Sequence, residues 1–221
     1  MKRRLLCILA VGAAVLAGQR VLVHSEEPAA APAKPAVSAE DRAKFIKEFH
    51  RTGLATTPED AMFCRIMVAA RGAKRGIEVG TERGYGAINM GIAFERNGGQ
   101  LFTLEIDPKV ADIARQNVAK MGLEKSVTVI TGDALKELPK LEGEFDFLFI
   151  DALKSDYLKY LQAIEAKLKP GAVIVADNAI QSAKAMKDFL DYMKTSSNYE
   201  TVIIKASQEK NDGMCVSYKI K

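Results

Sequence analysis

Cysteine is scarce in this chain, and the few cysteines are poorly spaced for structural chemistry. The sequence contains three, Cys7, Cys64 and Cys215, and no two of them form a Cys-x-x-Cys pair. This spacing excludes a disulfide framework and a cysteine-based zinc site. A single Cys64–Cys215 bridge stays open, although nothing else in the sequence supports it.

A large excess of charge of either sign is also missing. The formal net charge is +4, and part of it comes from the basic start of the chain at residues 2–4. Because the remaining charges nearly balance, no basic patch argues for nucleic acid or for an anionic membrane surface. With 221 residues, of which 48% are hydrophobic, the chain is sufficient for one domain plus appendages.

The start of the chain lacks an apolar run of ordinary membrane-spanning length. The stretch from Leu5 to Gly18 falls short of the ~20 residues that a spanning helix needs. A basic start, a short apolar run and a cleavage site near Val23 to Ser25 predict a signal peptide over residues 1–25. The protein is then exported (periplasmic or secreted), or held at the membrane if residues 1–25 form an uncleaved anchor. A buried N-terminal helix is the alternative.

Residues 26–38 are rich in proline and alanine and predict an extended linker. The domain, residues 39–221, begins with two capped helices. Ser38 caps a helix predicted from Ala39 to about Arg51, with Asp41 in its first turn. Thr57 caps the second helix, with a proline in its first turn.

From Gly76 onwards, short apolar runs alternate with helical segments. The runs are Gly76–Gly80, Leu101–Asp107, Val127–Asp133, Phe145–Asp151 and Ala172–Asn178. Helices are predicted at Tyr85–Asn97, Pro108–Met121, Ala134–Leu141, Ser155–Leu168 and Gln181–Thr195. Two last runs, Thr201–Ser207 and Gly213–Ile220, form a hairpin. The pattern predicts an α/β fold: a Rossmann-like, doubly wound, mostly parallel seven-stranded sheet with a C-terminal antiparallel hairpin and helices on both faces.

A glycine-rich loop follows the first of these strands and opens a helix. Its spacing, G-x-x-x-G-x-G from Gly80 to Gly86, differs from the loop that cradles a pyrophosphate. Glu105 ends the second strand, where a carboxylate can accept hydrogen bonds from a ribose diol. Asp133 ends the third, where it can take an adenine amino group or simply cap the next helix. With no lysine or arginine placed for a phosphate, these carboxylates favour a cationic, phosphate-free nucleoside.

The fourth and fifth strands also end in polar residues. Asp151 follows one strand, and Asp177 and Asn178 end the other. Since parallel strands bring their carboxyl ends to one edge, these hard oxygen ligands predict a site for Mg²⁺, or for Ca²⁺ or Mn²⁺. The alternative is that Asp151 caps a helix and that residues 177–178 form a turn. Lys154, one turn past Asp151, is a candidate general base.

In this order, the segments IEVGTERGYG, LEIDP, GDAL, FIDALKSDY and ADN resemble those of the cation-dependent O-methyltransferases. This group of the class I S-adenosylmethionine-dependent methyltransferases holds the catechol and caffeoyl-CoA enzymes, and the resemblance covers about Ala43 to Ile220. It implies catalysis by Lys154 and a metal on Asp151, Asp177 and Asn178. The cofactor contacts expected are Thr56, Glu78, Gly80, Thr81, Gly86, Glu105, Asp133, Ala134 and Asp151.

The chain also departs from this family. It has no tryptophan, which catechol-type relatives place beside the ring, and Gly86 replaces a serine found in many relatives. Leu153 replaces an aromatic or acidic residue, and Cys215 falls where catechol enzymes place a substrate-binding glutamate. The acceptor expected is therefore only a phenolic, catechol-like or vicinal-diol small molecule, and a homodimer is common among relatives. Two alternatives stay open: an exported, non-catalytic nucleoside- or metal-binding protein, and a metal-independent methyltransferase.

Overall fold

The computed structural model describes residues 37–221. The predicted signal peptide or anchor and nearly all of the predicted linker lie outside the described residues. Within residues 37–221, no helix is both long enough and apolar enough to cross a membrane.

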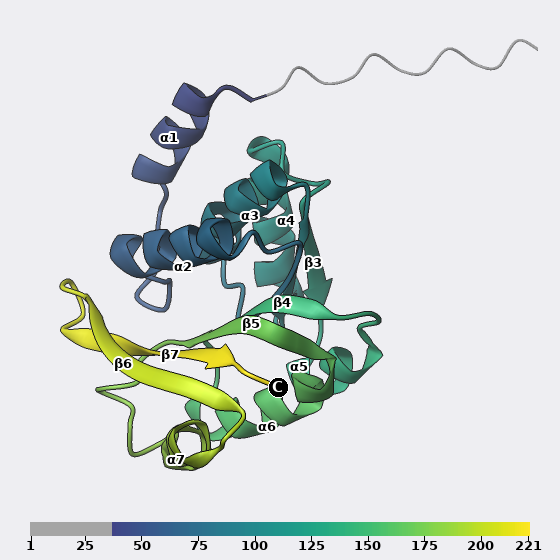
Figure 1. Cartoon of the computed structure of the whole chain (residues 1–221). Coiled ribbons are helices and arrows are strands. Elements are labelled where there is room, and N and C mark those ends of the chain that lie inside the picture. The colour runs from purple at the N-terminus through teal and green to yellow at the C-terminus, as the bar shows by residue number, and fades with distance from the viewer. Residues whose placement is uncertain (1–36) are drawn as a thin grey trace, which may run out of the picture. The chain divides into compact units, whose positions relative to one another are not determined.

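A single seven-stranded sheet forms the centre of the fold, with strand order β3-β2-β1-β4-β5-β7-β6 (Figure 1). Five strands are parallel, and β7 runs antiparallel to both β5 and β6. The strands are β1 Arg75–Val79, β2 Gln100–Glu105, β3 Val127–Thr131, β4 Phe145–Ile150, β5 Leu168–Ala176, β6 Tyr199–Ser207 and β7 Asp212–Lys219. The predicted fold class is confirmed.

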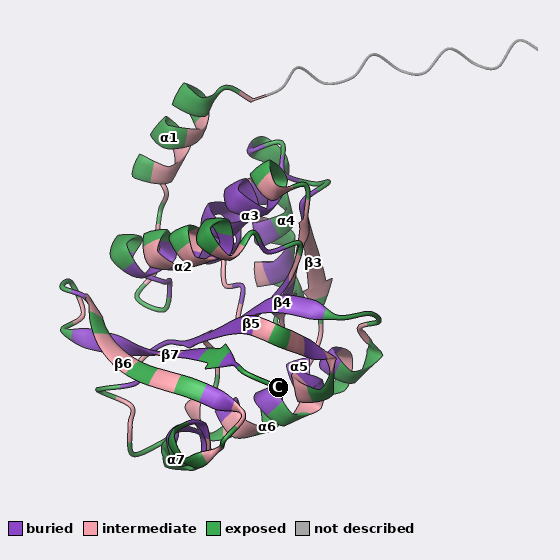
Figure 2. Ribbon diagram, viewed as in Figure 1, coloured by how far each residue is buried: buried purple, intermediate pink, exposed green. Residues whose placement is uncertain are grey.

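Helices cover both faces of this sheet (Figure 1). They are α1 Ala39–Lys47, α2 Pro58–Arg71, α3 Tyr85–Asn97, α4 Pro108–Lys120, α5 Ala134–Glu137, α6 Tyr157–Ile164 and α7 Lys187–Thr195, with single turns at Leu138–Lys140, Lys154–Asp156 and Glu165–Lys167. One buried cluster joins α2, α3 and α4 to the sheet, and a second joins α5, α6 and α7 to the opposite face. Figure 2 shows the resulting buried strands between the two helical layers.

Strand β4 shows why the apolar runs are continuous. Phe147 and Phe149 belong to the cluster under α2 and α3, whereas Leu148 and Ile150 belong to the cluster under α6 and α7. Every residue of β4 is buried. A strand covered on both faces needs apolar side chains at every position, because alternate residues point to opposite faces.

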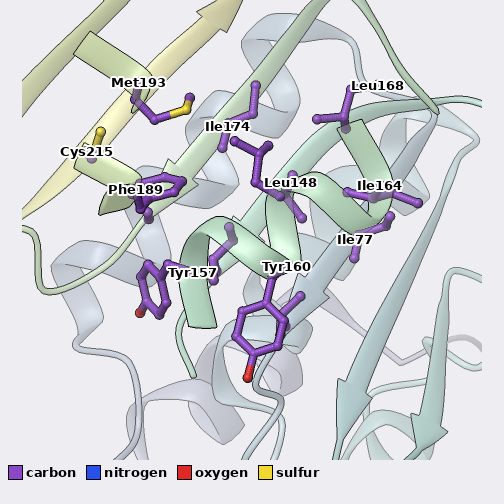
Figure 3. Packing of buried hydrophobic residues seen from close by; sticks show 14 of the residues in the cluster. Ile77, Leu148, Tyr157, Tyr160, Ile164, Leu168, Ile174, Phe189, Met193 and Cys215 are labelled. Carbon is purple, nitrogen blue, oxygen red and sulfur yellow. The ribbon is translucent and has the colours of Figure 1, made fainter. Parts of the chain in front are cut away.

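The second cluster is built around two aromatic side chains (Figure 3). Tyr157 and Phe189 pack edge to face with ring centroids 5.8 Å apart. Cys215 is buried on this side of the sheet, while Cys64 is buried on the other, and both are free thiols. The suggested Cys64–Cys215 bridge is therefore wrong. Cys215 is part of the core, which does not fit the position of a substrate-binding residue.

Three predicted boundaries shift. Helix α1 ends at Lys47 rather than near Arg51, and the N–H of Glu48 donates to the backbone oxygens of its last turn. Strand β5 begins at Leu168 rather than Ala172, since Phe145 pairs with Leu168 and an irregularity accommodates Pro170 before regular pairing resumes.

The third shift is at α7, which begins at Lys187 rather than Gln181. Residues 179–186 form a series of turns, and the N–H groups of Ile180 and Gln181 donate to the Asp212 carboxylate of the distant hairpin.

A substitution of Gly76 in β1 tests how closely the sheet packs against α3. A Cβ atom there would lie 2.2 Å from Cζ of Phe94, which is fully buried and cannot move away. We expect Gly76→Ala to lower the free energy of unfolding by about 1–3 kcal/mol in urea titrations. Gly53→Ala is the matched control, since nothing lies within 4 Å of its added Cβ. Equal stability of the two variants would contradict this packing.

Candidate active site

The glycine loop after β1 lies directly against the end of β4. Gly80 has a φ of +97°, and a Cβ atom on it would lie 2.1 Å from the backbone oxygen of Asp151. Gly84, with a φ of +91°, caps the start of α3. Any side chain at Gly80 would push the two segments apart, so glycine is needed for the close approach. The loop predicted for the cofactor and the carboxylate predicted for the metal therefore belong to one site.

Glu78 and Thr103 form a buried pair beneath this loop. The hydroxyl of Thr103 donates to the Glu78 carboxylate over 2.5 Å and lies 2.5 Å from the hydroxyl of Thr81. Burial raises the pKa of Glu78 to about 8, with further raising by the charges of Asp151 and Glu105. A cationic or hydrogen-bonding ligand beside Glu78 would stabilise its ionised form.

Thr56 and Gly86 meet Glu78 from two helix starts. A Cβ atom on Gly86 would lie 2.5 Å from Oε1 of Glu78 and 3.3 Å from Oγ1 of Thr56. The three predicted cofactor residues therefore converge. Because Gly86 has no side chain, the Glu78 carboxylate occupies the space that a Cβ atom at this position would need.

The structure also places the two carboxylates that follow β2 and β3. Glu105 accepts the N–H of Glu82 in the glycine loop over 2.8 Å, which holds the loop to the neighbouring strand. Asp133 caps α5 by accepting the N–H of Leu135, and Ala134 begins that helix. The capping alternative for Asp133 is thus observed, while contact of Asp133 and Ala134 with a cofactor stays a prediction.

Asp151 and Asp177 end two paired strands. The register pairs Ile150 with Ala176, and the N–H of Asp177 donates to Ile150 across the strand ends. The two carboxylates therefore follow neighbouring positions at the same edge, as predicted from the sequence. Asp151 caps no helix, because neither Lys154–Asp156 nor α6 has a side-chain cap.

The backbone changes direction immediately after β5. Asn178 has a φ of +61°, which ends the alternation of the strand and lets adjacent side chains face the same region. Its side-chain N–H donates to Asp212 over 3.0 Å. Because the nitrogen is held by Asp212, the oxygen is the atom of this amide that remains to accept or ligate.

The charge of Asp177 is poorly compensated by hydrogen bonds. Oδ1 accepts the N–H of Asn178 over 2.7 Å, whereas Oδ2 is buried and has no hydrogen-bond partner within residues 37–221. Burial, followed by the charge of Asp151, raises the pKa of Asp177. A buried carboxylate oxygen that accepts no hydrogen bond is stabilised by a cation.

Oxygen ligands at this edge fit a hard divalent cation, but they are few. In the part of the chain that the structure describes, no group of three or more His, Cys, Asp or Glu side chains is arranged to hold a metal ion. Asp151, Asp177 and the amide oxygen of Asn178 would hold the cation. The remaining coordination positions would be left to water or to an acceptor.

Lys154 is held by two partners. Its ammonium donates to Oδ1 of Asp151 over 2.9 Å and to the hydroxyl of Tyr157 over 2.8 Å. Tyr157 is fully buried, and burial raises the pKa of its hydroxyl well above the usual value. Tyr157 is not among the site residues predicted from the sequence. Its spacing of three residues from Lys154 was the available signal for the hydrogen bond.

The sheet order and the glycine loop at the β1/β4 reversal define the class of Rossmann-like α/β proteins. The O-methyltransferase family model matches residues 31–209. A catechol O-methyltransferase of Niastella koreensis is 38% identical over 147 residues, covering 65% of this chain and 66% of that protein. A catechol O-methyltransferase of Mycobacterium tuberculosis is 36% identical, covering 66% of each.

Solved structures show the same likeness. The O-methyltransferase TomG of Streptomyces achromogenes, solved with S-adenosylmethionine, has a TM-score of 0.73 at 26% identity, covering 82% of this chain and 89% of that one. An O-methyltransferase of Bacillus cereus, solved with S-adenosylhomocysteine, has a TM-score of 0.71 at 26% identity, covering 81% and 89%. The chain belongs to the class I S-adenosylmethionine-dependent O-methyltransferase family.

Gly86 provides a test of the cofactor pocket. We expect Gly86→Ser, which restores the residue of many relatives, to weaken S-adenosylhomocysteine binding by roughly tenfold in calorimetry. The new Cβ atom would displace the Glu78 carboxylate that it meets at 2.5 Å. Gly53→Ser, with open space around its Cβ, serves as the control. Tighter binding by Gly86→Ser would show that the hydroxyl matters more than the position of Glu78.

Proposed function

We propose that this protein transfers the methyl group of S-adenosylmethionine to a hydroxyl of a catechol-like or vicinal-diol small molecule, with a divalent cation at Asp151, Asp177 and Asn178. The observation that carries the proposal is the position of Lys154. Its ammonium lies between Asp151 and Tyr157, at the sheet edge where Asp177 also ends a strand. Two relatives named catechol O-methyltransferase, and two solved relatives that hold the cofactor or its product, support the same proposal.

The cofactor would lie across the glycine loop. Glu105 can accept from its ribose hydroxyls, and Glu78, Thr56, Thr81 and the N–H groups around Gly80 and Gly86 surround the start of α3. Because Gly80 lies against the backbone of Asp151, the sulfonium side of the cofactor would be oriented toward that residue. The methyl group would then face the edge proposed for the acceptor.

The proton of the acceptor would go to Lys154. An ammonium has three donor positions, and Asp151 and Tyr157 take two of them. The third position carries the lone pair once Lys154 is neutral, and it can accept the proton of the acceptor hydroxyl. When bound, a divalent cation would supply Lewis-acid polarisation of the acceptor oxygens.

Methyl transfer itself needs no covalent enzyme intermediate. The acceptor oxygen forms a bond to the methyl carbon as the bond from sulfur to that carbon breaks, which leaves S-adenosylhomocysteine. The protein contributes by holding the oxygen, the methyl group and the sulfur in line. Removing water from the edge and fixing Lys154 through buried Tyr157 serve this positioning.

Lys154 is the variant that tests the base. We expect Lys154→Met to lower kcat by about 10²–10⁴-fold while leaving S-adenosylmethionine affinity unchanged, because Lys154 contacts no predicted cofactor residue except Asp151. Lys159→Met is the control, since this lysine of α6 is exposed and forms an ion pair with Asp156. Activity retained in Lys154→Met would remove the lysine from the mechanism.

Metal dependence is tested separately with the full chain and a panel of catechols. We expect turnover that EDTA abolishes and that Mg²⁺ or Mn²⁺ restores. Turnover indifferent to EDTA would favour the metal-independent alternative, for which the ammonium groups near Asp151 and Asp177 already supply positive charge. No turnover with any acceptor, together with no binding of S-adenosylmethionine, would leave a non-catalytic protein of this fold.

A further inference from the structure

A lysine from outside the family motifs reaches the proposed metal site. Lys210 lies in the turn between β6 and β7, and its Nζ is 3.6 Å from Oδ2 of Asp177. This is the same oxygen that has no hydrogen bond within the described residues. Lys210 and Asp177 therefore form an ion pair without a hydrogen bond. This ion pair lies at the position proposed for the cation.

The turn that carries Lys210 is fastened from two sides. Glu209 forms an ion pair with Arg51, from the segment between α1 and α2, over 3.1 Å. The side-chain amide of Gln181 donates to the backbone oxygen of Lys210. These contacts hold the turn beside the end of β5, so the approach of Lys210 to Asp177 is built into the packing of the hairpin.

Asp60 supplies a third carboxylate near the same edge. It lies in the first turn of α2, and its side chain is fully buried. Oδ2 accepts from the hydroxyl of Thr57 over 2.6 Å, whereas Oδ1 has no partner in the described chain. The charges of Lys210 and Asp151 act on Asp60, and the charge of Asp60 acts on Asp177. A buried carboxylate oxygen without a partner is costly, so it is available to receive a donor.

We propose that Lys210 is a placeholder for the divalent cation: its ammonium neutralises Asp177 when the cation is absent and transfers to Asp60 when the cation binds. A dication and an ammonium on the same carboxylate oxygen repel each other strongly at such distances. Asp60 offers the displaced ammonium another carboxylate without requiring it to leave the site. Lys210 and Asp60 are thus positioning residues that set the affinity for the cation. Lys210 lowers this affinity by competing with the cation for Asp177, and Asp60 raises it by accepting the displaced Lys210 ammonium.

This inference rests on the cation part of the proposed function, and it is tested by binding rather than by turnover. Calorimetric titration of the full chain with MnCl₂ compares wild type with Lys210→Met. We expect about tenfold tighter binding in the variant, because no ammonium has to be displaced. Lys205→Met, which removes the charge of an exposed lysine in the same hairpin, is expected to leave the affinity unchanged. Unchanged or weaker Mn²⁺ binding by Lys210→Met would overturn the proposal.

Asp60 is tested in the same titration. We expect Asp60→Asn to weaken Mn²⁺ binding several-fold in the wild-type background and to have little effect when Lys210→Met is also present. The amide keeps the shape of the side chain and an oxygen for the Thr57 hydroxyl, and circular dichroism verifies the fold. Glu59→Gln, an exposed neighbour in α2, is the charge-matched control. Equal effects of Asp60→Asn in both backgrounds would show that Asp60 does not act through Lys210.

Hydrogen exchange adds a structural readout. We expect Mn²⁺ to change exchange in the turn of residues 207–212 of the wild type, because Lys210 leaves Asp177, and to change it far less in Lys210→Met. No Mn²⁺ binding by either protein would overturn this inference and the cation part of the proposed function together. Methyl transfer that continues in EDTA would then keep the rest of the proposed function intact.

Discussion

The contact between Gly80 and the backbone of Asp151 is the constraint on which the site depends. It joins the loop after β1 to the end of β4, and these two strands are neighbours at the reversal of strand order. A ligand on the glycine loop would therefore lie beside Asp151. The proposed cofactor and acceptor regions would share this contact, so a shift of either segment would misalign both.

Electrostatics dominate the remainder of the site. Asp60, Asp151 and Asp177 bring three carboxylates to one edge, and Lys154 and Lys210 bring two ammonium groups. Burial makes each of these charges costly unless it is paired. The two lysines differ in their attachment. Lys154 is fixed by a buried tyrosine and follows its aspartate in the sequence, whereas Lys210 arrives on a hairpin turn from far along the chain.

Several elements could be read from the sequence because their causes are local. The continuous apolar runs reflect burial on both faces of the sheet, and the caps at Ser38 and Thr57 are set by residues three positions apart. The start of α7 could not be read in this way. Residues 179–186 form turns instead, and Asp212, which belongs to β7, accepts the N–H groups of Ile180 and Gln181. A propensity pattern contains no information about a side chain that arrives from another strand.

The sequence by itself determined the family, the order of strands and helices, and the residue types at the strand ends. These follow from periodicity and from short motifs, and alternation along a strand is a local property. Only the tertiary structure decided that Asn178 turns toward Asp212 and that Lys210 approaches Asp177. Such contacts depend on how distant segments pack against one edge of the sheet, and that packing is a property of the whole fold.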